Sequence, residues 1–269
     1  MPARPWTLVA IIGLLLSSAA LAAQQSEPFT PQVGQAGKDV VWVPTPEALV
    51  EKMLDLAKVG PDDFVIDLGS GDGRNVIGAA RRGARALGVE YNPDMVELSR
   101  RKAAEAGVAG RATFERGDMF AADISRASVM ALFLLPSNLL QLRPKFLALA
   151  PGSRIVSNTF LIADWTPDAN TSVGESCEMW CEAYLWIVPA QAGGRWRLRG
   201  GELALTQTYQ KLTGTLTTDG TAAPVTGTMR GEEIELSSGA DSWRGRLRND
   251  TLELRAGDGR RITATRIRG

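Results

Sequence analysis

The sequence predicts an α/β fold, a doubly wound and mostly parallel sheet, followed by a C-terminal all-β antiparallel meander. Three observations predict it. Short apolar runs of strand length alternate with segments of helical periodicity across residues 41–192. One of these strands runs directly into a glycine-rich turn that opens a helix. From residue 193 onward the chain carries only period-two strands and turn residues.

The expected elements of the first domain follow one another in β-α order. The predicted strands are 64–68, 86–90, 112–115, 129–134, 154–159 and 184–188. The predicted helices are 73–82, 93–106 and 139–149, with an earlier helix that Thr45 caps and Pro46 opens. Such alternation implies a parallel sheet with helices on both faces, and it places a ligand at the carboxyl ends of the strands.

The C-terminal region, residues 193–269, is expected to form a separate antiparallel meander, either a small curled sheet or a barrel. Its apolar residues come in period-two pairs separated by turn signals such as Gly200-Gly201 and Asn249-Asp250. These paired apolar positions are Leu203, Leu205, Ile234, Leu236, Leu252 and Leu254.

The N-terminus has the pattern of a secretory signal peptide. Arg4 precedes an apolar run from Leu8 to Leu16, and small residues end at Ala22, where cleavage is expected. This divides the chain into a signal peptide (1–22), a flexible leader (23–40), a ligand-binding domain (41–192) and the β domain (193–269). We expect a secreted or periplasmic protein, with an uncleaved anchor over residues 7–23 as the alternative and a cytoplasmic protein if the signal is not used.

Composition excludes several kinds of chemistry. The chain of 269 residues contains no histidine, which removes histidine general bases and most catalytic zinc sites, and we expect no metal. Thirty basic and thirty acidic residues balance, so no global field attracts nucleic acid or an anionic membrane, and we expect neither as a partner beyond the N-terminal segment. The two cysteines, Cys177 and Cys181, can form one disulfide in an oxidising compartment.

The residues that carry chemistry surround the glycine turn. Asp67 and Leu68 end the buried strand, and the run Gly69-Ser70-Gly71-Asp72-Gly73 opens the next helix. Glu90 ends the following strand, twenty-one residues after Gly69, where an acid accepts hydrogen bonds from ribose hydroxyls. Asp118 follows the third strand, where the adenine end of a nucleoside is expected. An acid at position 67 suits a ligand with a cationic amino-acid end better than a pyrophosphate.

From about Val43 to Asp168 the chain resembles class I methyltransferases that use S-adenosylmethionine (SAM), which have a Rossmann-like sheet. Its Val43-Pro44-Thr45-Pro46 run followed by the glycine turn is similar to a prokaryotic group related to protein-lysine methyltransferases. The resemblance implies SAM as cofactor and methylation of a protein lysine or a small amine. It implies that Asp67, Gly69 and Gly71 hold the methionine part, Glu90 the ribose, Asp118 and Met119 the adenine, and that Thr45 lies near the methionine carboxylate.

Two features leave alternatives open. The position after the fourth strand reads Leu134-Leu135-Pro136-Ser137-Asn138, unlike the Asn-Pro-Pro-Tyr type signature of amine-methylating enzymes, so the acceptor and the catalytic residues are not assigned. Export also conflicts with a cofactor that is made in the cytoplasm. The alternative to an enzyme is therefore an exported, non-catalytic protein that keeps the methyltransferase fold and binds a nucleoside-like ligand.

Overall fold

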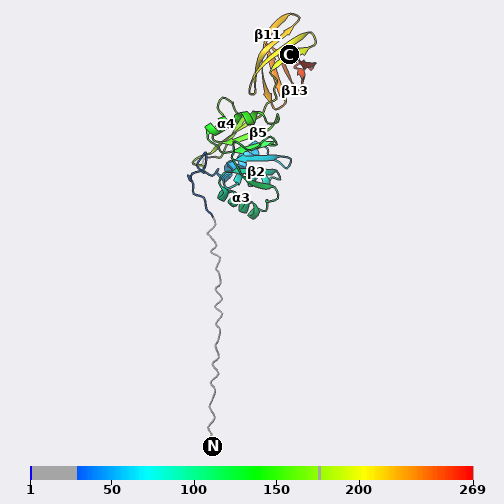
Figure 1. The fold of residues 1–269 in the computed structure, drawn as a ribbon. Coiled ribbons are helices and arrows are strands. Elements are labelled where there is room, and N and C mark those ends of the chain that lie inside the picture. The colour runs from blue at the N-terminus through cyan, green and yellow to red at the C-terminus, as the bar shows by residue number, and fades with distance from the viewer. Residues whose placement is uncertain (2–28, 175–176, 269) are drawn as a thin grey trace. The chain divides into compact units, whose positions relative to one another are not determined.

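The computed structural model describes Met1, residues 29–174 and residues 177–268 (Figure 1). The expected signal peptide and the first part of the leader lie outside the described residues. The described residues from Pro31 onward belong to one compact unit. No helix in the described ranges is long and apolar enough to cross a membrane.

The first domain is built around a seven-stranded sheet with the order β3-β2-β1-β4-β5-β7-β6. The strands are β1 (Phe64–Leu68), β2 (Arg85–Glu90), β3 (Ala112–Arg116), β4 (Val129–Leu132), β5 (Arg154–Asn158), β6 (Ala169–Ser172) and β7 (Glu182–Ile187). The first five pair in parallel, whereas β7 pairs antiparallel with both β5 and β6. The strand order reverses between β1 and β4, where such sheets bind ligands.

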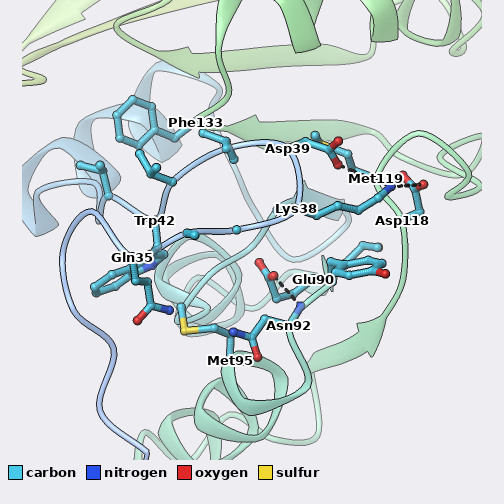
Figure 2. Close-up of a pocket in the computed structure, with 18 of the residues that line it drawn as sticks. Gln35, Lys38, Asp39, Trp42, Glu90, Asn92, Met95, Asp118, Met119 and Phe133 are labelled. Carbon is cyan, nitrogen blue, oxygen red and sulfur yellow. Dashed lines mark hydrogen bonds and ion pairs between the residues drawn. The ribbon is translucent and has the colours of Figure 1, made fainter.

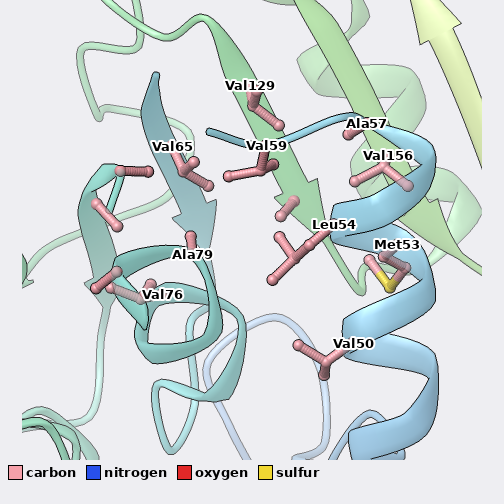
Figure 3. Packing of buried hydrophobic residues seen from close by; sticks show 14 of the residues in the cluster. Val50, Met53, Leu54, Ala57, Val59, Val65, Val76, Ala79, Val129 and Val156 are labelled. Atoms are coloured by element: carbon pink, nitrogen blue, oxygen red, sulfur yellow. The ribbon is translucent and has the colours of Figure 1, made fainter. Parts of the chain in front are cut away.

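Four helices cover this sheet and give it two apolar layers. They are α1 (Glu47–Leu56), α2 (Arg74–Arg81), α3 (Pro93–Glu105) and α4 (Pro136–Leu147). Alternate strand residues point to opposite faces, so Val65 packs with α1 and α2, while Ile66 packs with α4 in a separate cluster. Figure 3 shows the first cluster, in which Val50 and Leu54 of α1 lie beside the sheet. The predicted fold, a sheet covered on both faces, is confirmed.

The C-terminal β domain is a closed antiparallel barrel, with its strands in the order β10-β11-β12-β13-β14-β15-β8-β9. Its strands are β8 (Gly194–Leu198), β9 (Gly201–Thr208), β10 (Lys211–Thr218), β11 (Thr221–Arg230), β12 (Glu233–Ser238), β13 (Asp241–Arg248), β14 (Thr251–Ala256) and β15 (Arg261–Arg266). All six apolar residues that the period-two pattern singled out are buried within it. Pairing of β8 with β15 closes the barrel.

Several expected details are wrong. Pro46, not Thr45, occupies the N-cap of α1, and no side chain caps that helix. The fourth strand ends at Leu132, two residues early, and α4 begins at Pro136 because a proline fits the first turn of a helix. Strand β6, with the sequence Ala-Asn-Thr-Ser, has no apolar periodicity and was not expected.

Candidate cofactor site

The glycine turn between β1 and α2 has the geometry that a backbone-lined ligand site requires. Gly69, Gly71 and Gly73 all have positive φ, at 69°, 54° and 82°, which side chains rarely adopt. The turn is tied to the next strand, because the amides of Gly69 and Ser70 both donate to the Val89 carbonyl, at 2.8 and 3.1 Å. Gly71 has no room for a side chain, since an added Cβ would lie 2.7 Å from Nε1 of Trp42.

Asp67 is a buried acid with no cationic partner among the described residues. It is 3% exposed, and Asn75 Nδ2 donates to its Oδ2 at 3.1 Å. Burial raises the pKa of Asp67 well above its usual range. The Oδ1 of Asn75 also has no hydrogen-bond partner among the described residues. A ligand ammonium would satisfy both groups, because it would compensate the charge of the Asp67 carboxylate and donate a hydrogen bond to Asn75 Oδ1.

Asp72, the second acid of the turn, is compensated within the protein. It is 2% exposed, yet Arg74 Nη2 lies 2.7 Å and Lys102 Nζ 2.5 Å from its Oδ2. Burial alone raises the pKa of Asp72, but the hydrogen bonds and charges of Arg74 and Lys102 outweigh it and leave the pKa below its usual value. Of the two acids in this turn, only Asp67 is therefore left to receive a cation from a ligand.

Glu90 is held by backbone donors at the end of β2. Its Oε2 accepts from the Gly71 amide at 3.0 Å. Its Oε1 accepts from the Asn92 amide at 2.9 Å, as Figure 2 shows. Each carboxylate oxygen can accept a further hydrogen bond. Glu90 is thus fixed beside the glycine turn with free acceptor capacity for two hydroxyls of a ribose.

Asp118 and Met119 follow β3 and line the same cavity as Glu90. The amide of Phe120 donates to Asp118 Oδ1 at 2.8 Å, and Lys38 Nζ donates to Oδ2 at 2.6 Å. The hydrogen bond from Lys38 lowers the pKa of Asp118. Met119 is 6% exposed and belongs to the apolar cluster on the α4 side of the sheet. This pair offers an acid beside an apolar surface, which suits a purine.

A segment before α1, residues 35–43, crosses the cavity (Figure 2). We call it the strap. Its ends are joined by a hydrogen bond from the Trp42 amide to the Gln35 carbonyl at 2.9 Å. Lys38 lies over the ring of Tyr91, 5.2 Å from the centroid, as well as on Asp118. Residues 35–40 were part of the expected leader, and nothing in their composition indicates this role.

Thr45 lies on the floor of the site but is already engaged. It is 3% exposed, and its Oγ1 accepts from Asn158 Nδ2 at 3.2 Å. Its carbonyl oxygen accepts from Arg74 Nη1. Thr45 therefore joins the segment before α1 to the ends of β5 and α2. A role beside a methionine carboxylate stays a prediction.

The structure brings all seven expected site residues to two adjoining cavities. Gly69, Glu90, Asp118 and Met119 line the first, and Thr45, Asp67, Gly69 and Gly71 line the second. Gly69, Trp42, Val43 and Phe133 line both. Sequence analysis missed Trp42, Asn75 and Phe133, because their types carry no ligand signal outside this geometry.

The residues present fit SAM. An uncompensated buried acid suits its amino group, an anchored carboxylate suits its ribose, and the pair of Asp118 and Met119 suits its adenine. By contrast, a pyrophosphate at the glycine turn would meet the acid Asp67, which has no cationic partner among the described residues. The site thus favours a nucleoside with a cationic amino-acid end over a dinucleotide.

Comparisons with known proteins agree with this geometry. The family model described as the ANTKMT methyltransferase domain matches residues 67–169. A protein-lysine N-methyltransferase of Saccharolobus islandicus (strain REY15A) is 41% identical over 152 residues, which is 55% of this chain and 94% of that protein. The mouse (Mus musculus) adenine nucleotide translocase lysine N-methyltransferase is 39% identical over 127 residues, 46% of this chain and 55% of that protein.

One solved structure is also close. It is that of an RNA methyltransferase from Salinibacter ruber in complex with S-adenosyl-L-homocysteine (SAH), and it is 46% identical with a TM-score of 0.52. The match covers 55% of this chain and 95% of that one. The relatives therefore share one methyltransferase domain, while their names differ in the acceptor. The chain belongs to the SAM-dependent methyltransferases.

Proposed function

We propose that this protein transfers the methyl group of SAM to the side-chain nitrogen of a protein lysine. The observation that carries the proposal is the buried, uncompensated Asp67 beside the anchored Glu90, within a domain that covers 94% of the archaeal protein-lysine methyltransferase. The family membership favours an enzyme over an exported non-catalytic binder.

The residues of the chain have distinct parts in this proposal. Asp67 takes the amino group of the cofactor, Glu90 takes the ribose hydroxyls, and Asp118 with Met119 takes the adenine. Thr45 lies near the carboxylate, and the strap covers the cofactor from the side of Trp42 and Lys38. These contacts align the cofactor and exclude water, which is the main contribution that methyl transfer needs from a protein.

When bound, SAM would supply an activated methyl carbon whose bonding electron pair would stay on the sulfur, and the lysine nitrogen would form the new bond with its own lone pair. The lysine must first release a proton to solvent, because an ammonium has no lone pair. No histidine is needed for this step.

The acceptor can be tested with labelled SAM. We would incubate the full chain with methyl-labelled SAM and the separated protein and RNA fractions of a bacterial extract, then hydrolyse each fraction. The proposal predicts label in methylated lysine, and none with a Glu90→Ala control. Label in methylated nucleosides would instead favour RNA methylation, the activity for which the Salinibacter ruber protein is named.

We place the enzyme outside the cytoplasm, in the periplasm or the medium. Cys177 and Cys181 form a disulfide in the structure, and such bonds persist in oxidising compartments. Mass spectrometry of protein from its native host should find Ala23 as the first residue, and thiol labelling without reductant should leave both cysteines unlabelled. A retained Met1 together with two labelled thiols would contradict export.

A further inference from the structure

Three aromatic rings meet beside the cofactor site, at the carboxyl ends of two strands. Phe133 directly follows β4, Phe160 follows β5, and Trp180 belongs to the loop before β7. Their ring centroids lie 6.1 Å apart for Phe133 and Phe160, 5.5 Å for Phe133 and Trp180, and 5.6 Å for Phe160 and Trp180. All three side chains are half-buried, so the cluster is accessible from solvent. We call it the aromatic triad.

The aromatic triad lies toward the reacting end of the proposed cofactor. The acids assigned to the nucleoside follow β2 and β3, the acid assigned to the amino group lies on β1, and β4 and β5 come next in the sheet. Phe133 lines both cavities of the site, and Figure 2 shows it on the opposite side of the pocket from Asn92. An acceptor approaching the methyl group from the β4 side would therefore contact the aromatic triad.

The backbone that presents two of these rings is strained. Thr159, next to Phe160, has φ of 58°, and Trp180 has φ of 60°. The left-handed region is unfavourable for any residue with a Cβ and particularly so for β-branched threonine. The Thr159 amide donates to the Glu182 carbonyl at 2.8 Å, and the disulfide between Cys177 and Cys181 closes the loop that carries Trp180. Such strain accumulates at binding sites, where a side chain must take a particular position.

The stretch of sequence that carries Phe160 and Trp180 has charged residues of one sign, although Arg143 of α4 lies 3.6 Å from Asp164. Between Arg154 and Arg195 the sequence has no basic residue and five acidic ones. These acids are Asp164, Asp168, Glu175, Glu178 and Glu182. A nucleic-acid acceptor would need basic residues for its phosphates, whereas a cationic acceptor is attracted by acids. The charge of this region therefore favours an amine over an RNA.

We propose that Phe133, Phe160 and Trp180 form the acceptor subsite, which takes the nitrogen end of a lysine side chain and retains it after methylation. The inference rests on the proposed function and names the residues that select its acceptor. A cation resting on a triangle with these centroid separations lies within about 6 Å of all three rings, the range of cation–π attraction. Aromatic clusters recognise quaternary ammonium groups in this way, so the subsite suits repeated methylation of one nitrogen.

The test uses choline as a probe, with 3,3-dimethylbutan-1-ol as its uncharged counterpart of the same shape. Each is titrated by NMR into the full chain saturated with SAH. We expect choline to bind more tightly than the alcohol, since only choline gains cation–π attraction. Trp180→Ala should weaken choline binding by about 2- to 30-fold, the range that such contacts contribute.

Matched variants separate a binding role from simple packing. Trp243→Ala removes a half-buried tryptophan of the barrel and should leave choline binding unchanged. Trp180→Phe keeps an aromatic ring and should restore most of the binding, and Phe160→Ala should repeat the loss. SAH affinity should stay at the wild-type value in every variant. Equal binding of choline and the alcohol, or full choline binding in both Trp180→Ala and Phe160→Ala, would overturn the inference.

Failure of the inference and failure of the proposed function give different results. If lysine is methylated but Trp180→Ala leaves the KM for the protein acceptor unchanged, the aromatic triad is not the acceptor subsite. If choline binds as expected but the label never enters lysine, the proposed function is wrong and the assignment of lysine to this subsite falls with it.

Discussion

Replacing Glu90 with glutamine tests the link between the glycine turn and the cofactor. The carboxylate accepts from two backbone amides, of Gly71 and Asn92. Glutamine keeps one acceptor oxygen and replaces the other with an amide group that cannot accept, so one backbone donor loses its partner. An unpaired, partly buried donor costs about 1–3 kcal/mol. For a domain of this size the expected fall in Tm is about 2–12 °C.

The same substitution also replaces the charged acceptor that is proposed to bind the ribose hydroxyls with a neutral amide. Hydrogen bonds to charged groups contribute about 1.5–3 kcal/mol. We therefore expect the Kd for SAH to rise about 10- to 150-fold in Glu90→Gln. Circular dichroism on heating and calorimetric titration measure the two effects. Glu115→Gln, an exposed glutamate on β3, is the matched control and should change neither. Wild-type Tm and wild-type SAH affinity in Glu90→Gln would refute this reasoning.

Two further substitutions probe the same turn. Asp67→Asn should stabilise the ligand-free protein at neutral pH, because the raised pKa of Asp67 means that the wild-type free energy of unfolding falls as pH rises toward that pKa. The gain from the substitution should therefore shrink as pH falls. SAH should also raise the Tm of the variant less than that of the wild type. A variant with no gain at neutral pH would contradict the burial argument. Gly88→Ala would place a Cβ 2.5 Å from Ser70 Oγ and 2.7 Å from Phe114 Cδ1. We therefore expect the free energy of unfolding to fall by about 1–3 kcal/mol in a denaturant titration, and SAH to bind more weakly. Gly60→Ala, whose added Cβ has nothing within 4 Å, is the control and should be neutral.

Local patterns predicted the parts of this fold that local interactions decide. The strand before the glycine turn, the turn and the helix after it lie within one short stretch, and Asp67, Gly69, Gly71 and Glu90 line the two adjoining cavities. The period-two pairs of the C-terminal region also marked the barrel interior correctly.

Features that depend on distant partners could not be predicted. Thr45 has the residue type of an N-cap, but its hydroxyl accepts from Asn158, 113 residues away, and Pro46 takes the cap position. Strand β6 forms only because β7 lies beside it, since its own sequence is polar. Barrel closure depends on the pairing of β15 with β8, and the strap depends on Lys38 meeting Asp118, 80 residues away.

The contrast between the two acids of the turn also needed the structure. The sequence singled out Asp67 by its place before the first glycine, but it did not show that Asp72 has cationic partners. In the structure, Arg74 and Lys102 compensate Asp72, whereas the described part of the chain gives Asp67 only an amide donor, from Asn75. That difference supports the proposed role of Asp67 toward the cationic end of the cofactor, and it depends on a lysine 30 residues away in α3.

Calorimetric titration of the full chain with SAH and, separately, with NAD tests the central claim most directly. The account predicts that SAH binds at one site per chain and that NAD does not bind, because a pyrophosphate would face the acid Asp67 beside the glycine turn. Binding of NAD without SAH, or of neither ligand, would contradict the claim that this constellation holds SAM.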